Sequence, residues 1–401
     1  MKVIQINAFY EYSSTGRTTR EMHEFLKSKD IDSYVFCANM EIKGENVFQI
    51  GNKLDHKIHA FFSRLFGLQG YFSFLPTRRL LNKLLKIQPD VVILRNLHSN
   101  YINIPQLLRF LGGHDISSIV VLHDCFFYTG HCCYYTYDNC LKWEKECNNC
   151  PILYKYNNSL FFDRSRKIFR DRRKLFGSIR NLAIVGVSDW VTNEAMRAPI
   201  FAGAKIIRRI YNWIDLDVFQ PLDDDEYRAK YNINRNDFVV LGVAQRWNDV
   251  KGLPQFIELA QHMPNIKVIL VGDIEPQDLP HNIIKVGVKS DTTELAHFYS
   301  MADVFVNFSI QETFGKVAAE ALSCGTPIIV NRSTANPELC GEGCGLIVEN
   351  RDWKEVMECV KEVMKNGKAL YTRRCRDYAV ENFEKVKGIQ QYMGLFNDLL
   401  M

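Results

Sequence analysis

Short apolar runs alternate with amphipathic helical stretches along most of this chain, and this alternation restricts the fold more than any other feature. Runs that are rich in β-branched residues and apolar at consecutive positions are typical of strands covered on both faces, as in a parallel sheet. Five such runs lie in each half of the chain, at 2–9, 32–39, 90–97, 117–124 and 182–189, and at 237–245, 266–273, 282–288, 302–309 and 326–332. We expect helices between them, at 17–29, 77–87, 103–111, 160–177, 252–262, 291–300, 314–323 and 352–366. The pattern predicts an α/β protein with two βαβ domains in tandem.

The apolar periodicity breaks near 212–231, where acidic turn-forming residues follow. We therefore place a first domain at 1–212, with a Cys-rich insertion at about 125–158, a second domain at 213–383 and a last helix at 384–401. Two domains suit a chain of 401 residues. Since such sheets bind ligands at the carboxyl ends of their strands, we expect the active site in a cleft between the domains.

Composition limits the location and the partners. No run of about 18 uncharged apolar residues indicates a membrane-spanning helix, and the N-terminus is typical of a first strand rather than of a signal peptide. We expect a cytoplasmic protein, whose twelve cysteines would be reduced thiols or metal ligands. Residues 1–220 hold 30 Lys and Arg against 20 Asp and Glu, a charge of +10, and the remainder carries −6. The basic half suggests an anionic partner or simply a solvated surface.

The stretch "SIQETFGKVAAEALSCGTPIIVN" (309–331) follows a predicted strand and opens a predicted helix. Free amides at a helix N-terminus and the positive end of its dipole form an anion site, and Gly315 would let a phosphate approach the backbone. A diphosphate there would leave Glu320 able to reach a ribose hydroxyl, and Glu312 would face the group beyond the phosphates. Arg246 and Lys251 follow the first strand of this domain and offer two cations to a leaving diphosphate. The alternative is an ordinary amphipathic helix with surface charges.

Several of these segments resemble one known family. "QETFGKVAAEALSCGTPII" resembles the E-x7-E signature of retaining glycosyltransferases of family four, which have the GT-B fold, and "AQRWNDVKG" (244–252) resembles their Arg…Lys-Gly loop. "STGRTTREM" (14–22), "LHD" (122–124) and "AIVGVSDWVTNEA" (183–195) resemble their first glycine loop, a histidine at a strand end, and a Val-x-x-Ser strand with its helix. The matches run in the expected order over nearly the whole chain. The subgroup that the chain resembles builds capsule, O-antigen or colanic-acid type polysaccharides.

The resemblance implies a role for each matching residue. Gly16, Arg246, Lys251, Phe314, Gly315, Lys316 and Val317 would bind the donor diphosphate, and Glu320 the donor ribose. His123 and Glu312 would be the catalytic residues, which position the donor sugar and stabilise its charge. The last helix would cross back onto the first domain. No metal is expected to be required for catalysis, since the basic pair stabilises the leaving group.

The sequence also departs from the family pattern. Gly16 is the single glycine of the first loop, and the linker reads "NWID" (212–215), with Trp213 in place of the usual glycine. Two Asp-x-Asp patterns, Asp215–Asp217 and Asp223–Asp225, lie in the segment between the domains. We interpret them as turn and helix-start residues rather than metal ligands.

The acceptor and the membrane are predicted from the first domain. Asn96, His98 and Asn100 follow a strand end and are candidates for an acceptor site or for capping and core roles. The stretches 61–86 and 164–176 combine basic residues with aromatic or aliphatic ones, so either could lie on an anionic membrane, or form a core helix with a solvated face. The expected acceptor is a saccharide, attached to a lipid if the membrane interpretation holds.

Six cysteines crowd into residues 125–150. Cys132, Cys140, Cys147 and Cys150 are candidate ligands of a structural zinc, and Cys147-x-x-Cys150 has the spacing of a metal half-site. Reduced thiols in a small aromatic core and disulfides are the alternatives. Cys125 and Cys133 do not fit the cysteine pattern of the resembling subgroup.

Parts of the sequence are also compatible with two other functions. One is a sugar-nucleotide 2-epimerase of the same fold, against which the two glutamates and the basic loop argue. The other is a zinc-containing nucleic-acid-binding protein, but the sequence offers no element that reads a groove, so no nucleic-acid partner is expected.

Overall fold

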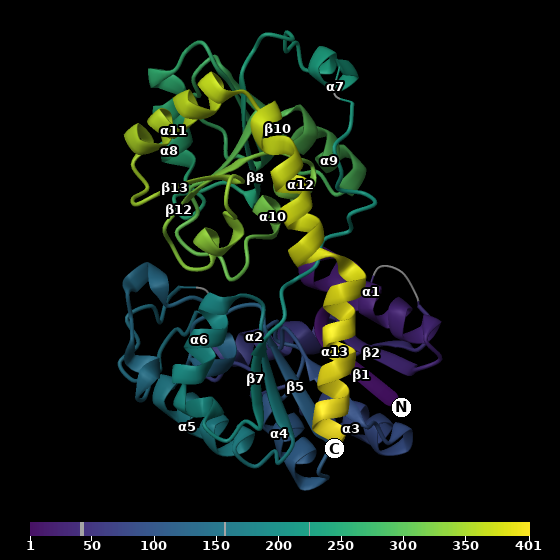
Figure 1. Ribbon diagram of the computed structural model, residues 1–401. Coiled ribbons are helices and arrows are strands. Elements are labelled where there is room, and N and C mark those ends of the chain that lie inside the picture. The colour runs from purple at the N-terminus through teal and green to yellow at the C-terminus, as the bar shows by residue number, and fades with distance from the viewer. Residues whose placement is uncertain (41–43, 156–157, 224) are drawn as a thin grey trace. The chain divides into compact units, whose positions relative to one another are not determined.

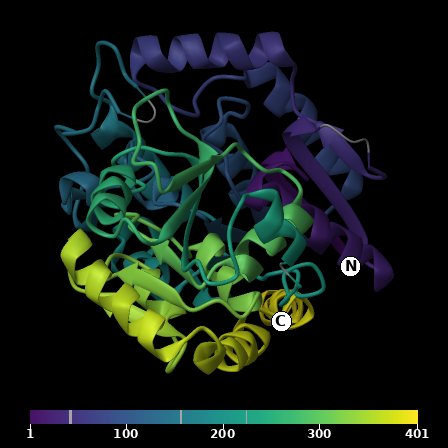
Figure 2. The same cartoon turned by 90° about the horizontal axis from the view of Figure 1, so that it is seen from above.

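The chain forms two compact units. The computed structural model describes residues 1–40, 44–155, 158–223 and 225–401, so positions 156 and 157 of the predicted insertion lie outside the described residues. Unit 1 comprises Met1–Ile210 and Ile389–Met401, and unit 2 comprises Tyr211–Gly388. Both chain termini therefore belong to unit 1, as Figures 1 and 2 show.

Unit 1 is built on a seven-stranded parallel sheet with the order β3-β2-β1-β4-β5-β6-β7. Its central strands are buried along their whole length, because helices cover both faces. The strands are β1 (Lys2–Tyr10), β2 (Asp32–Met40), β3 (Val47–Gln49), β4 (Val91–Leu94), β5 (Ser117–Leu122), β6 (Leu182–Gly186) and β7 (Ile206–Arg209). The helices are α1 (Ser13–Ser28), α2 (Lys53–Phe66), α3 (Phe74–Ile87), α4 (Ile104–Gly113), α5 (Ser165–Phe176) and α6 (Asp189–Arg197).

Unit 2 repeats the plan with a six-stranded parallel sheet in the order β10-β9-β8-β11-β12-β13. The order turns back beside β8, so the loops after β8 and β11 leave adjacent strands at the carboxyl edge, where sheets of this type bind ligands. The strands are β8 (Val239–Arg246), β9 (Lys267–Asp273), β10 (Ile283–Val286), β11 (Val304–Asn307), β12 (Ile328–Asn331) and β13 (Gly345–Val348). The helices are α7 (Asp225–Lys230), α8 (Leu253–His262), α9 (Thr292–Met301), α10 (Lys316–Ser323), α11 (Trp353–Asn366) and α12 (Ala369–Phe383).

The last helix, α13 (Lys385–Leu400), begins in unit 2 and continues as part of unit 1 from Ile389 onward. Asp398 pairs with Arg208 of β7 at 2.8 Å, which ties the end of the helix to the edge of the first sheet. The helix thus returns to the first unit, as the predicted fold class requires.

The segment that enters unit 2 explains the tryptophan in the linker. Trp213 is buried, and a Cβ added to Gly388 would lie 3.1 Å from its ring, so the indole packs on the start of α13. Asp215 pairs with Lys385 at 2.8 Å and accepts from the amide of Asp217. Asp223 likewise accepts from the amide of Asp225 at the start of α7. Both Asp-x-Asp patterns therefore serve local turns in the described structure.

The Cys-rich insertion connects β5 to α5 and contains only short 3-10 turns among its described residues, η1 (Phe126–Tyr128), η2 (Thr136–Asp138) and η3 (Lys142–Glu144). Its first part is nonetheless buried. Trp143 is 1% exposed and lies between Tyr128 and Tyr135, with ring centroids 4.9 and 5.1 Å away. The insertion thus has a small aromatic core of its own.

Candidate functional site

The loop that joins β11 to α10 carries Glu312, and the loop after β8 carries Lys251. The Lys251 ammonium lies 2.6 Å from Glu312 Oε1 and 3.4 Å from Ser309 Oγ. Both side chains are partly shielded from solvent, with 35% and 17% of their surfaces exposed. The two residues that the sequence analysis assigned to the diphosphate and the sugar therefore meet at the carboxyl edge of the unit 2 sheet.

A buried amide network fixes the Glu312 loop. Asn336 donates to the Ser309 carbonyl at 3.2 Å and to Asn331 Oδ1 at 3.0 Å, and Asn307 Oδ1 accepts from the Ser309 amide. The Glu312 amide donates to Thr334 Oγ1 at 2.8 Å. Because these bonds occupy both ends of the loop, Glu312 is held in place by residues from two neighbouring strands.

Two glycines are required by the backbone at this edge. Gly252 has φ of +84°, and a Cβ there would lie 2.2 Å from the Cβ of Phe308. Gly315 has φ of +86° and precedes the first residue of α10; its carbonyl accepts from the amides of Ala318 and Ala319. Lys316 and Val317 precede these two alanines in the first turn of the helix. Their backbone amides lie at the positive end of the helix dipole, which suits an anionic ligand.

Two of the residues predicted to bind the donor, Phe314 and Glu320, have almost fully buried side chains. The side chain of Phe314 is 2% exposed and packs between Tyr211 and Phe383, with ring centroids 5.8 and 5.4 Å away, so only its backbone can face a ligand. Glu320 is 3% exposed, and its Oε2 accepts from the Tyr299 hydroxyl at 2.9 Å. The ribose role of Glu320 remains a prediction.

Arg246 ends β8 at the same edge of the sheet and is paired with Glu275. Both partners are largely exposed, at 63% and 71%, so this ion pair contributes little to stability. The Arg246 side chain is free to exchange Glu275 for a phosphate at small cost. Arg351 supports the neighbouring loop by donating to the carbonyls of Asp249 and Phe308, each at 2.6 Å.

In unit 1, His123 follows β5 and is 9% exposed. Its Nε2 lies 3.2 Å from Nη1 of Arg95, a fully buried guanidinium that also donates to Gln5. Gly16 lies in the first turn of α1, where a Cβ would meet the backbone of Glu11 at 3.1 Å. Glu11 has φ of +72°. The Gly16 turn therefore packs too closely for any larger residue to fit without displacement.

The candidate acceptor residues lie after β4. His98 Nε2 lies 2.8 Å from Asp124 Oδ2. Burial lowers the pKa of the His98 imidazole, but the attraction of Asp124 outweighs burial and raises this pKa above its ordinary value of 6.5. Burial raises the pKa of the Asp124 carboxyl, but the attraction and hydrogen bond of His98 lower it by more, so this pKa lies below its ordinary value of 3.8. Asn100 Oδ1 is buried without a hydrogen-bond partner among the described residues, while the Asn96 carbonyl accepts from Tyr101.

Sequence reasoning missed several residues that shape these sites. Arg95, Asn307 and Asn331 were assigned only to predicted strands. A charged or amide side chain at the end of an apolar run was the available signal, since such groups are buried only with partners.

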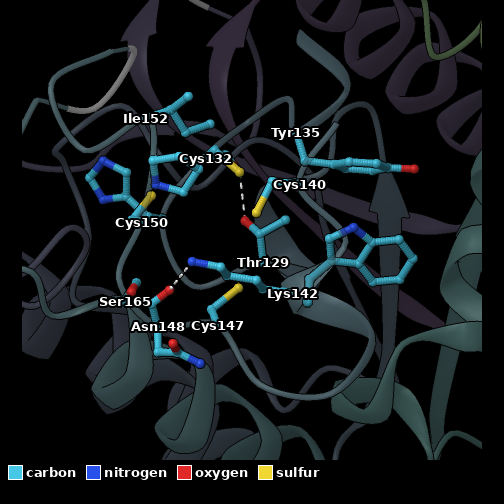
Figure 3. A pocket seen from close by; sticks show the side chains of 13 residues that line it. Thr129, Cys132, Tyr135, Cys140, Lys142, Cys147, Asn148, Cys150, Ile152 and Ser165 are labelled. Atoms are coloured by element: carbon cyan, nitrogen blue, oxygen red, sulfur yellow. Dashed lines mark hydrogen bonds between the residues drawn. The ribbon is translucent and has the colours of Figure 1, made fainter. Parts of the chain in front are cut away.

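The four cysteines proposed as zinc ligands line one cavity, together with His131, Lys142 and Trp143 (Figure 3). All twelve cysteines lie among the described residues, and no disulfide links any of them. A different group meets the distance expected of metal ligands. Among the described residues, the potential metal-binding atoms of His98, Asp124 and Cys133 all lie within 4.8 Å of one another.

Comparison with known proteins identifies the family of the second unit. The family model described as glycosyl transferases group 1 matches residues 223–392. This part of the chain is a group 1 glycosyltransferase domain. It contains Arg246, Lys251, Glu312 and Glu320.

The whole chain is similar to glycosyltransferases. The putative colanic acid biosynthesis glycosyl transferase WcaC of Escherichia coli is 22% identical over 325 residues, which cover 78% of this chain and 77% of WcaC. The D-inositol 3-phosphate glycosyltransferase of Mycobacteroides abscessus is 26% identical over 42% of each chain. For the first two curated relatives, the matched region spans 42% and 62% of the relative's length.

Solved structures match the fold over its full length. A glycosyltransferase from Rickettsia africae gives a TM-score of 0.70 at 14% identity and covers 100% of this chain and 98% of its own. Anabaena HepE in complex with UDP gives a TM-score of 0.65 at 15% identity, covering 99% and 100%. Together with the two parallel α/β sheets, these similarities confirm the predicted GT-B fold class.

Proposed function

We propose that the protein is a retaining glycosyltransferase of the E-x7-E type, which moves a sugar from a nucleoside-diphosphate sugar to a saccharide acceptor. The observation that carries the proposal is the Lys251–Glu312 pair, held beside the start of α10 inside a group 1 glycosyltransferase domain. A leaving diphosphate needs cations and amide donors where its charge develops. Lys251, Arg246 and the first turn of α10 provide both kinds of group on one edge of the sheet.

The chemistry follows from this arrangement. The bond between the anomeric carbon and the diphosphate oxygen breaks, and its electron pair stays on the leaving diphosphate. An acceptor hydroxyl attacks on the same face, and its proton passes to a leaving phosphate oxygen. Glu312 stabilises the positive charge on the sugar, and His123 keeps its predicted role beside that sugar. No residue acts as a nucleophile, and no metal is required for this step.

The proposed acceptor is a lipid-linked saccharide of a bacterial surface polysaccharide. WcaC, which the chain matches over most of its length, is named for colanic acid biosynthesis. Unit 1 also carries a surface suited to an anionic membrane. We define the α2 face as the exposed apolar side chains Leu54, Ile58, Phe61, Leu160, Phe161 and Phe162, with the basic side chains Lys53, Lys57, Arg64 and Arg164.

The two segments that form the α2 face are joined by a backbone hydrogen bond. The Leu160 amide donates to the Arg64 carbonyl at 2.8 Å, so the loop at 160–162 lies against the end of α2. Phe61 is 61% exposed and lines a hollow with Lys57, Arg64 and Leu160. Apolar groups beside cations are what an anionic headgroup layer accommodates.

Helix α5, the other predicted membrane element, differs. Its apolar side, including Ile168, Phe169 and Leu175, is packed inside unit 1, which leaves only its basic side exposed. No helix among the described residues is long and apolar enough to cross a membrane.

The function is tested by turnover. Purified protein is incubated with UDP-, GDP- and ADP-sugars and a lipid-linked saccharide, and both transfer and donor breakdown are measured. Lys251→Ala should lower kcat/KM by about 10²- to 10³-fold, because the diphosphate loses a positioned cation. Lys361→Ala is the matched control, since Lys361 pairs with Glu358 at 2.8 Å on the exposed face of α11. A nucleotide sugar that is epimerised without transfer, or a Lys251→Ala variant with full turnover, would refute the proposal.

A further inference from the structure

Four cysteines from separate turns of the insertion converge on one cavity. Cys132, Cys140, Cys147 and Cys150 all line it, whereas Cys125 and Cys133 do not (Figure 3). Cys132 is 7% exposed, and the other three are half-buried. The cavity has a volume of about 20 Å³.

A backbone amide points at one of these sulfurs. The Gly130 amide donates to Cys147 Sγ at 3.2 Å. A thiol sulfur is a weak acceptor, whereas a thiolate is a good one, so amides aimed at sulfur favour the ionised form. The approach depends on glycine, because a Cβ at Gly130 would lie 2.7 Å from the Cβ of Cys147 and 2.3 Å from the Ser165 carbonyl.

Two cations lie beside the same sulfurs. Arg172 of α5 is 3% exposed, donates to the Thr129 carbonyl at 2.6 Å, and interacts electrostatically with Cys147. Lys142 lines the cavity, donates to the Asn148 carbonyl at 3.1 Å, and interacts electrostatically with Cys150. Cations and amides at this cavity therefore match thiolates better than thiols.

The insertion also contains little regular secondary structure. Between β5 and α5 it is stabilised by 3-10 turns and by the aromatic core around Trp143, and it has no helix or strand among its described residues. Segments of this length without regular structure are uncommon in compact domains unless they are cross-linked or functional. The half of the insertion around Cys140, Cys147 and Cys150 is less buried than the half that precedes it.

We propose that Cys132, Cys140, Cys147 and Cys150 bind one structural Zn²⁺ that cross-links the insertion. Four thiolates are a closed, tetrahedral ligand set typical of structural rather than catalytic zinc. Binding forms four Zn–S bonds and releases four thiol protons to solvent. The resulting centre carries a charge of −2, which Arg172 and Lys142 neutralise.

Metal binding must draw the sulfurs closer together. With Zn–S bonds of about 2.3 Å, the sulfurs of a tetrahedral site lie about 3.8 Å apart. Among the described residues, no three of these sulfurs form a group within 4.8 Å of one another. The half-exposed turn from Cys140 to Cys150 is the part that can move, since Cys132 is fixed in the buried half.

Zinc content is the direct test. Protein purified under reducing conditions with added Zn²⁺ and then desalted should contain one zinc per chain, measured by elemental analysis. Cys147→Ser and Cys150→Ser should lose most of it. Cys125→Ala, a buried cysteine of the same insertion, and His98→Ala, from the other candidate group, should keep it. Replacing the ion by Co²⁺ in the wild-type protein should give the visible absorption of a tetrahedral thiolate site, a readout that does not depend on variants folding.

Several results would overturn the proposal. One is wild-type protein that stays metal-free after zinc and cobalt addition. Another is an unchanged zinc content in Cys150→Ser. A third is zinc that is lost in His98→Ala but kept in Cys147→Ser, which would place the ion at the His98, Asp124 and Cys133 group. Disulfides among the four cysteines in metal-free protein would count equally against it.

Discussion

At the scale of single residues, unit 1 contains an electrostatic pair whose effect depends on pH. His98 and Asp124 lie 2.8 Å apart, with the carboxylate 9% exposed. The pKa of His98 is raised, so its stabilisation is fully present below its unfolded value of 6.5 and is lost as pH rises through the folded pKa. The pKa of Asp124 is lowered, so its stabilisation is present above 3.8 and is lost as pH falls through the folded pKa. Between 3.8 and 6.5 both partners are charged.

Removing the Asp124 carboxylate should therefore lower stability by an amount that depends on pH. Asp124→Asn should lower the urea unfolding midpoint most between pH 3.8 and 6.5, and the difference from wild type should shrink as pH rises above that window. His262→Gln is the control, because His262 and Glu258 are 3.9 Å apart and about half exposed, where an ion pair contributes little. A difference between wild type and Asp124→Asn that does not change with pH would contradict the assignment.

Residue-scale reasoning from the sequence singled out Lys251 and Glu312 as candidates but did not predict their contacts. Lys251 and Glu312 were recognised from their positions after strand ends, where parallel sheets place ligands. Their direct ion pair, and the amide network that fixes Glu312, depend on which strands are neighbours. Because β8 and β11 are adjacent only in the folded sheet, no spacing along the chain reveals that contact.

At the scale of elements, the Lys251 loop depends on a glycine. Gly252→Ala should destabilise unit 2, because alanine would adopt φ of +84° and its Cβ would lie 2.2 Å from that of Phe308. The positive φ costs about 1–3 kcal/mol, and the clash adds about 1–3 kcal/mol more. Gly287→Ala is the control, since Gly287 does not have a positive φ and nothing lies within 4 Å of the new Cβ. Urea unfolding should show a larger loss for Gly252→Ala than for Gly287→Ala, and equal losses would contradict the argument from backbone and packing.

The elements predicted correctly are those with a strong pattern. Each of the ten predicted strands overlaps an observed one, because buried parallel strands are apolar on both faces. The edge strands β3, β7 and β13 were missed since they are short and half-exposed, so no continuous apolar run marks them. Helices α2, α7 and α12 were also not among the predicted helices; on α12, charged residues are spread around most of the surface.

At the scale of the whole molecule, part of the excess positive charge of residues 1–220 lies on two helices of unit 1. The excess of Lys and Arg in residues 1–220 includes the basic side chains of the α2 face and the exposed side of α5. On α5 these bases pair with acids, as Arg170 does with Glu146 and Lys167 with Asp171. The sequence predicted helices with apolar and basic sides, but burial alone distinguishes α5, whose apolar side is covered, from α2, whose apolar side is exposed. Burial depends on tertiary contacts, which the pattern of apolar and basic residues along the sequence does not reveal.

This distinction predicts which helix binds a membrane. Wild-type protein should sediment with vesicles that contain anionic phosphatidylglycerol, and less with neutral phosphatidylcholine vesicles or at high salt. Phe61→Asp should weaken binding about tenfold or more, because an aromatic side chain no longer enters the interface and a negative charge faces the lipid. Leu370→Asp is the control, since Leu370 is 58% exposed in unit 2, comparable to the 61% of Phe61. If both variants bind like wild type, the α2 face is not the membrane contact, and if neither anionic lipid nor salt affects the wild type, the membrane proposal fails.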